Sequence, residues 1–163
     1  ALSYMDKQMY GEALDSLTKA IEIYPENQIL FYLAGGCSAR KAKSLIDETE
    51  KMNYFSLAEK YYKRALFLEP KYVDALLGLA VIYAIEYNIP EEAEPLLKTI
   101  LSVEKNNLQA MSLLARVYFQ QGRYEDSLDL YKLFEKQSNV PENKKQAREN
   151  IKLIEDLMSK RSE

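Results

Sequence analysis

A helical pattern that returns along the chain is the strongest constraint on its fold. Four small residues mark it, Ala13, Ala58, Ala93 and Ser127, at spacings of 45, 35 and 34 residues. The positions three residues before, four after and seven after each marker are mostly apolar: Tyr10, Leu17, Ala20; Phe55, Tyr62, Ala65; Pro90, Leu97, Ile100; Tyr124, Tyr131, Phe134. These offsets place the side chains on one face of a helix. The chain therefore repeats an amphipathic helix with an underlying period of 34 residues.

A second helix precedes the marked one in each unit. It has the same pattern at two places, Leu76-x2-Leu79-Ala80-x2-Tyr83 and Met111-x2-Leu114-Ala115-x2-Tyr118, and a weaker copy at Phe31-x2-Ala34-Gly35-x2-Ser38. The small residue in its middle (Gly35, Ala80 or Ala115) lets a neighbouring helix approach closely. Two helices with wide apolar faces cannot bury those faces within one short unit, so the units must stack on one another.

These positions resemble the tetratricopeptide repeat (TPR), whose pattern runs W-x2-L-G-x2-Y, then A-x3-F, then P. The resemblance covers essentially residues 1–139, although the chain has no Trp and replaces it with Phe31, Leu76 and Met111. Lys105 and Asn139 stand where the closing Pro is expected. The resemblance implies an all-α fold, a right-handed α-solenoid of antiparallel helix pairs (a TPR superhelix). We also expect a C-terminal capping helix, because one apolar stripe in the last segment is backed by charged residues.

We expect a single TPR domain over residues 1–163, made of a truncated repeat, a repeat with an eleven-residue insertion, two ordinary repeats and the capping helix, at 1–25, 26–70, 71–104, 105–139 and 140–163. The expected helices span about 1–8, 11–24, 28–44, 48–68, 72–87, 91–103, 107–121, 124–137 and 141–160. The inserted residues lie between Gly36 and Asn53, and Asp47 followed by Glu50 predicts an early start for the next helix. We therefore expect a helical hairpin taller than its neighbours, either a ridge for a partner or a tolerated extension.

Composition excludes several function classes. His is absent, which removes Ser-His and Cys-His nucleophiles and the commonest metal ligand. Cys37 is the only cysteine, so no intrachain disulfide is possible, and we interpret it as a packing residue. The acidic group at 90–94 is interpreted as a solvated helix start, and no phosphate-binding loop or metal-ligand spacing is present. The sequence therefore predicts that the protein is not an enzyme and needs no cofactor or metal.

Charge and hydropathy also limit the partners. The formal net charge is −3 with a pI near 5.3, which argues against nucleic-acid binding. The longest apolar run, residues 75–85, is shorter than the ~20 residues that a membrane span needs. Because the chain opens with Ala, a leader or upstream repeats could have been removed. A cytoplasmic location is slightly favoured, and a secreted or periplasmic one stays open.

The resemblance implies that ligand contacts come from the first helix of each unit. The family's ligand-facing positions correspond here to a largely apolar set, from which we take as candidates Tyr32, Gly36, Leu77, Val81, Ser112, Arg116 and Phe119. Some TPR proteins use Lys, Asn and Arg at these positions to hold the C-terminal carboxylate of heat-shock chaperones. Only Arg116 could play that part here, so the chain does not match that clamp. The implied function is a scaffold that binds a peptide or helix of a partner protein in an apolar concave groove.

A structural role is the alternative interpretation. The N-terminal end has no cap comparable with the expected C-terminal helix, so its apolar surface needs a neighbour. The chain would then be a segment of a longer solenoid or a unit that forms a homo-oligomer through its N-terminal end.

Overall fold

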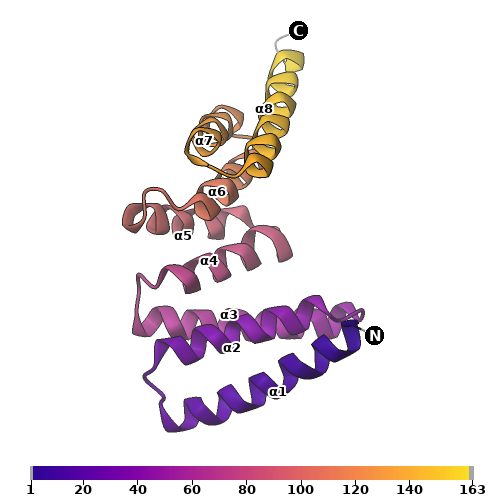
Figure 1. The fold of residues 1–163 in the computed structure, drawn as a ribbon, viewed down its shortest axis with the longest axis vertical. Helices are drawn as coiled ribbons and strands as arrows, with labels where there is room; N and C mark the ends of the chain where they lie inside the picture. The colour runs from indigo at the N-terminus through magenta and orange to yellow at the C-terminus, as the bar shows by residue number, and fades with distance from the viewer. Residues whose placement is uncertain (1, 162–163) are drawn as a thin grey trace. The chain divides into compact units, whose positions relative to one another are not determined.

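The computed structural model describes the backbone of residues 2–161 and the side chains of residues 9–160. Within these residues it contains eight α-helices, one π-helix and no strand. The elements are α1 (Leu2–Ile23), α2 (Gln28–Lys43), α3 (Glu48–Leu68), α4 (Val73–Val81), η1 (Ile82–Glu86), α5 (Pro90–Val103), α6 (Leu108–Gln120), α7 (Tyr124–Gln137) and α8 (Pro141–Arg161) (Figure 1). None of these helices is long and apolar enough to cross a membrane.

The chain divides into two compact units, an N-terminal unit of residues 1–82 and a C-terminal unit of residues 83–163. In the N-terminal unit, α1 to α4 lie side by side and neighbouring helices run in opposite directions (Figure 1). Alternating direction follows from the short turns between helices, which leave no room for a parallel return. The expected antiparallel helix pairs are therefore present.

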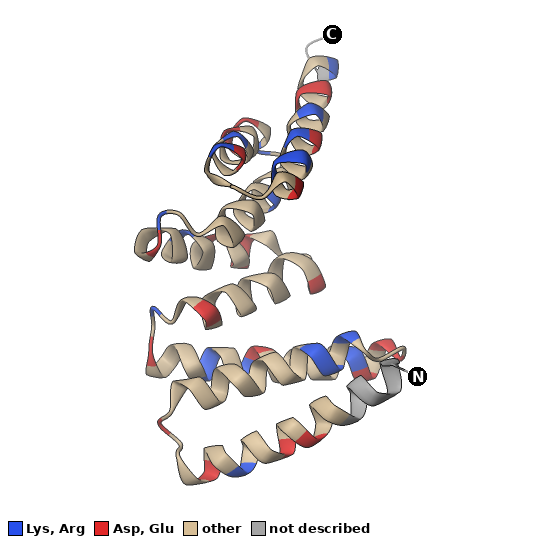
Figure 2. Ribbon diagram, in the orientation of Figure 1, with Lys and Arg blue, Asp and Glu red and all other residues tan. Residues whose placement is uncertain are grey.

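The C-terminal unit packs α6, α7 and α8 around two small apolar clusters. Met111, Phe134 and Ala147 form the first cluster. The second contains Ala115, Tyr131 and Ile154, with Ile151 and Met158 packed against it. The apolar stripe of α8 thus covers α6 and α7, while Figure 2 shows positive and negative residues mixed along the rest of that helix. The predicted C-terminal capping helix is confirmed.

Three of the four marker positions lie in the helix contacts. Ala58, Ala93 and Ser127 have no exposed surface. The Ser127 hydroxyl donates a hydrogen bond of 2.7 Å to the Ala115 carbonyl oxygen, so a polar atom is satisfied where Ala stands in the other units. A buried hydroxyl without such a bond would destabilise the fold. Ser therefore substitutes for Ala at the marker without breaking the contact between α6 and α7.

The predicted tall hairpin is formed by α2 and α3. These helices have 16 and 21 residues, compared with 13 and 14 for α6 and α7. The Asp47 side chain accepts a hydrogen bond of 2.8 Å from the Glu50 backbone N–H and caps α3 at the predicted place. At the tip, Lys41 lies over the Tyr54 ring, 4.4 Å from its centroid. The insertion is therefore helical on both sides of a short turn.

Two features of the helices differ from the prediction. Residues 2–23 form one helix, whereas the sequence pattern predicts a break near residues 9 and 10. That stretch has no Pro and only Gly11 as a breaker, and one interior Gly costs only about 1 kcal/mol. The second difference is at the end of α4, where the expected α-helix becomes a π-helix. Ile89, which precedes Pro90 and is therefore disfavoured in α geometry, donates its N–H to the Tyr83 carbonyl at 2.8 Å.

Candidate binding surface

In the N-terminal unit, α2 and α4 carry four of the seven candidate residues. Tyr32 and Gly36 lie one turn apart on α2, and Leu77 and Val81 lie one turn apart on α4. All four are half-buried. The opposite faces of the two helices are buried in the unit and carry Phe31, Ala34, Leu76, Leu79 and Ala80. The helical period therefore leaves the candidate positions partly accessible, and none of the four carries a charge.

Tyr32 belongs to a cluster of three tyrosines. Its ring centroid lies 6.2 Å from that of Tyr62 and 5.4 Å from that of Tyr72, the second contact being edge to face. Burial raises the pKa of Tyr62 to about 12 and also raises the pKa of Tyr72. Both phenols therefore stay neutral at ordinary pH. The repeat pattern does not single out Tyr72, because it stands at the N-cap of α4, outside the family's ligand positions.

The Tyr62 ring is held between two glycines on different helices. A Cβ atom on Gly35 of α2 would lie 2.7 Å from Tyr62 Cε1, and one on Gly78 of α4 would lie 2.6 Å from Tyr62 Cζ. Both distances are shorter than van der Waals contact, so only glycine fits at either place. The ring therefore sets the spacing of the two helices that carry the candidate residues. Gly78 has no signal in the repeat pattern, because only the tertiary contact requires it.

The other three candidates lie on α6 in the C-terminal unit. Arg116 is exposed, whereas Ser112 and Phe119 are half-buried. The Phe119 ring lies 5.4 Å from the Tyr124 ring and packs against the cluster of Ala115 and Tyr131. Phe119 thus contributes to packing between α6 and α7 as well as to the surface. Arg116 is the single charged member of the candidate set.

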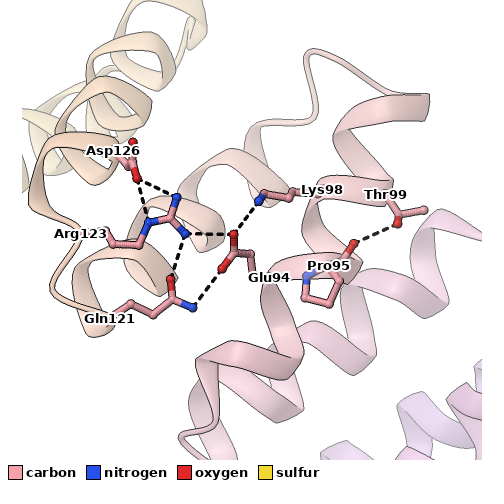
Figure 3. A network of polar contacts seen from close by, with 7 residues as sticks. All are labelled: Glu94, Pro95, Lys98, Thr99, Gln121, Arg123 and Asp126. Atoms are coloured by element: carbon pink, nitrogen blue, oxygen red, sulfur yellow. Dashed lines mark hydrogen bonds and ion pairs between the residues drawn. The ribbon is translucent and has the colours of Figure 1, made fainter.

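A polar network in the C-terminal unit joins α5 to the turn between α6 and α7 (Figure 3). Glu94 accepts hydrogen bonds of 3.0 Å from both Gln121 and Arg123, and Lys98 pairs with it at 2.6 Å. The hydrogen bond from Lys98, with those from Gln121 and Arg123, lowers the pKa of Glu94 to about 2 against the effect of burial. The network connects segments 29 residues apart, which explains why the repeat pattern contains no sign of it. The network therefore stabilises the contact between α5 and the turn that joins α6 to α7.

The network changes the interpretation of the acidic stretch at residues 90–94, which the sequence alone favours as a solvated helix start. Glu91 and Glu92 fit that interpretation, since both are exposed in the first turn of α5. Glu94 does not fit it, because its side chain is only 17% exposed and has three partners. Glu94 is therefore a packing and pairing residue of the C-terminal unit.

Metal binding and thiol chemistry are two further possibilities for the same surfaces. Within the described part of the chain, no group of three or more His, Cys, Asp or Glu residues is placed to hold a metal ion. Burial raises the pKa of the half-buried Cys37 thiol, which disfavours the reactive thiolate.

Comparisons with known proteins agree with this arrangement. Two family profiles, both described as tetratricopeptide repeat, match residues 1–27 and 84–137. Among solved structures, TTC0263, a thermophilic TPR protein of Thermus thermophilus, superposes with a TM-score of 0.75 at 19% sequence identity, over 88% of this chain and 74% of that one. The chain therefore contains tetratricopeptide repeats. In this chain, the long hairpin of α2 and α3 lies between the two matched ranges.

A second solved structure is similar over nearly its whole length. MamA 41-end from Desulfovibrio magneticus RS-1 shares 14% sequence identity, with a TM-score of 0.65, over 99% of this chain and 96% of that chain. These likenesses show an all-α solenoid fold. A comparison with curated protein sequences finds no significant match. TPR domains generally bind other proteins and are generally not enzymes, so the fold suggests a scaffold for protein–protein interaction.

Proposed function

We propose that this TPR protein is a non-enzymatic scaffold whose first helices bind an apolar segment of a partner protein. The contact residues in this proposal are Tyr32, Gly36, Leu77, Val81, Ser112, Arg116 and Phe119. The observation that carries it is the set of four uncharged, partly accessible positions on α2 and α4 beside the three-tyrosine cluster. Four uncharged positions of this kind favour an apolar ligand over an acidic one.

The expected contributions to the binding free energy also favour an apolar ligand. Burying an apolar side chain contributes about 1.5–3 kcal/mol, whereas an exposed Arg paired with a carboxylate contributes under about 1 kcal/mol. Leu77 and Val81 therefore outweigh Arg116 in this proposal. The matching ligand is an amphipathic helix, or an extended segment with apolar side chains, that docks on an apolar surface.

The test uses a peptide selected against the full chain from a displayed random-peptide library. Its affinity is then measured by calorimetry for the parent, Leu77→Glu and Arg116→Ala, at low and at high salt. Leu77→Glu should weaken binding at least tenfold, because it places a charge in the apolar contact. Arg116→Ala and salt should change the affinity less than threefold.

Leu153→Glu is the matched control. It makes the same chemical change at a Leu that is 52% exposed on α8, a helix that carries none of the candidate positions, and should leave peptide binding unchanged. If salt and Arg116→Ala abolish binding while Leu77→Glu does not, the ligand is acidic and the apolar interpretation fails. If Leu153→Glu weakens binding as strongly as Leu77→Glu, the peptide binds elsewhere and the proposal also fails.

Self-association through the N-terminal end is a second candidate function. The observation that favours it is on α1, where Tyr10, Ala13, Leu17 and Ala20 are all half-buried. Their counterparts on α3, α5 and α7 are buried, with the single exception of Tyr124. A repeat helix that is only partly covered has room for one more helix.

A further inference from the structure

A narrow uncharged stripe of exposed and half-buried residues runs along α1. Five residues compose it at alternating spacings of four and three, Met9, Ala13, Ser16, Ala20 and Ile23. The two large apolar residues at its ends, Met9 and Ile23, are 62% and 69% exposed. This spacing is that of the seam between two packed helices. We call these five residues the α1 seam.

The repeats in the same chain indicate what kind of neighbour the seam requires. In α7, the marker Ser127 contacts Ala115 of the preceding, antiparallel first helix. The equivalent marker on α1 is Ala13, which is half-buried, whereas Leu14 is the one buried residue among the described side chains of α1, and α2 lies beside that helix. The missing neighbour is therefore an antiparallel helix that approaches the small residues of the seam closely.

The α1 seam is complementary to itself when it is reversed. Its three central residues are small and its two ends are large, in the order Met9, Ala13, Ser16, Ala20, Ile23. Two antiparallel copies centred on Ser16 would place each Met9 opposite the other copy's Ile23, with small residues facing each other between them. Ile23 also borders an open hollow of about 630 Å³ at the turn between α1 and α2, which a flexible Met side chain can enter.

The charges beside the seam favour the same pairing. Glu12 and Lys19 lie on one flank, seven residues apart and on either side of Ser16. In an antiparallel pair, like flanks meet, so each Glu12 would face Lys19 of the other copy and two opposite-charge contacts form around the twofold axis. A parallel pair would bring opposite flanks together and set Glu12 near the apolar Leu17 instead. The Ser16 hydroxyl already donates to the Glu12 carbonyl oxygen at 2.9 Å, so covering it leaves no unsatisfied donor.

We propose that a second copy of this chain occupies the α1 seam, as an antiparallel α1–α1 pair centred on Ser16. This inference rests on the self-association proposed above and specifies its interface. The pair is closed by a twofold axis, so it makes a dimer and does not continue into a filament. One helix pair is a small interface, and we expect dissociation in the micromolar range.

The first test is a disulfide across the twofold axis. Ser16→Cys is made in a Cys37→Ser background, and the purified full chain is mildly oxidised at a concentration well above its dimer dissociation constant. The two introduced thiols face each other across the axis and should cross-link the chains as a covalent dimer. Asp15→Cys in the same background is the matched control, since Asp15 is exposed and points away from the seam. It should cross-link at most one tenth as much.

The second test exchanges the flanking charges, with dissociation constants measured by sedimentation. Lys19→Glu alone and Glu12→Lys alone each set two like charges against each other and should weaken the dimer about five- to tenfold. The double variant restores opposite charges and should recover the parent value within about twofold. A parallel pair, or contact through another surface, predicts no such recovery.

The outcomes separate the two levels of the proposal. A strict monomer at millimolar concentration overturns both self-association and the α1 seam. Equal cross-linking of the Ser16→Cys and Asp15→Cys variants, or a dissociation constant that does not change with the charge exchange, would support self-association but overturn this interface. Preferential cross-linking of Ser16→Cys, with recovery in the double charge variant, supports the seam. Peptide binding to the first helices is measured separately, so none of these results bears on it.

Discussion

Helices α1 and α3 are second helices of successive repeats, and they have the same pattern of small and apolar residues. Ala58 and Ala65 of α3 have no exposed surface, whereas the equivalent Ala13 and Ala20 of α1 are half-buried. The difference comes from their neighbours, because α3 lies against both α2 and α4, while α1 has only α2 beside it among the described residues. The same residue type in the same register can thus be core in one repeat and surface in the next.

The two helices also use glycine differently. Gly35 and Gly78 enclose the Tyr62 ring of α3, whereas a Cβ atom on Gly11 of α1 would meet only the Lys41 Nζ atom, at 3.5 Å. The first two glycines make space for a neighbouring helix, and Gly11 does not. A glycine in a repeat helix is therefore a packing requirement only where an aromatic ring is pressed against it.

The largest expected effect tests burial at the shared alanine position. Ala65→Arg puts an unpaired charge between packed helices and should lower the free energy of unfolding by about 3 kcal/mol or more. Ala20→Arg, measured at dilution where a single chain is present, should cost under about 1 kcal/mol, because the side chain can reach water. Urea titration followed by circular dichroism measures both. Equal losses would mean that α1 is as fully enclosed as α3.

Glycine replacement gives the next largest effect, and the two helices should respond with opposite signs. Gly35→Ala adds a methyl group against the Tyr62 ring, and Gly78 on the other side of the ring prevents the ring from moving away. Overpacking of this kind should lower the free energy of unfolding by about 1–3 kcal/mol, which should exceed the gain of about 1 kcal/mol from the higher helix propensity of Ala. Gly11→Ala has no such clash and should stabilise α1 by up to about 1 kcal/mol. Thermal melts of the two variants beside the parent give the signs. Stabilisation by Gly35→Ala would show that Tyr62 can move aside.

The smallest expected effect extends the comparison to α5, where contacts lie outside the repeat pattern. Because the pKa of Glu94 is lowered to about 2, its ionised form stabilises the fold above a pH of about 4.5, and that contribution is lost as the pH falls toward 2. Glu94→Gln should lower the free energy of unfolding by about 0.5–1 kcal/mol at pH 7. The difference in stability between this variant and the parent should shrink as the pH falls from about 4.5 toward 2. Glu92→Gln, at an exposed position on the same helix, is the control. A difference that persists at pH 2 would contradict the assigned role of the carboxylate.

The sequence predicted most of the fold. Periodicity located the helices from α2 to α8 within a few residues, and Asp47 marked the start of α3, because helix faces and caps depend on residues that are close along the chain. The break expected in α1 was wrong, since one glycine is a weak signal without a turn around it. The role of the seven candidate binding residues stays a prediction, supported by their partial exposure on α2, α4 and α6.

What the sequence by itself determined is the period, the identity of the helices and the face that each one turns inward. Only the tertiary structure decided that Tyr62 lies between Gly35 and Gly78, that Glu94 reaches Arg123, and that the α1 seam is left open. The physical reason is the distance along the chain over which each kind of interaction acts. Propensity and amphipathicity act within one or two helical turns, whereas ring insertion, charge pairing and coverage depend on which helix from a distant part of the chain lies alongside.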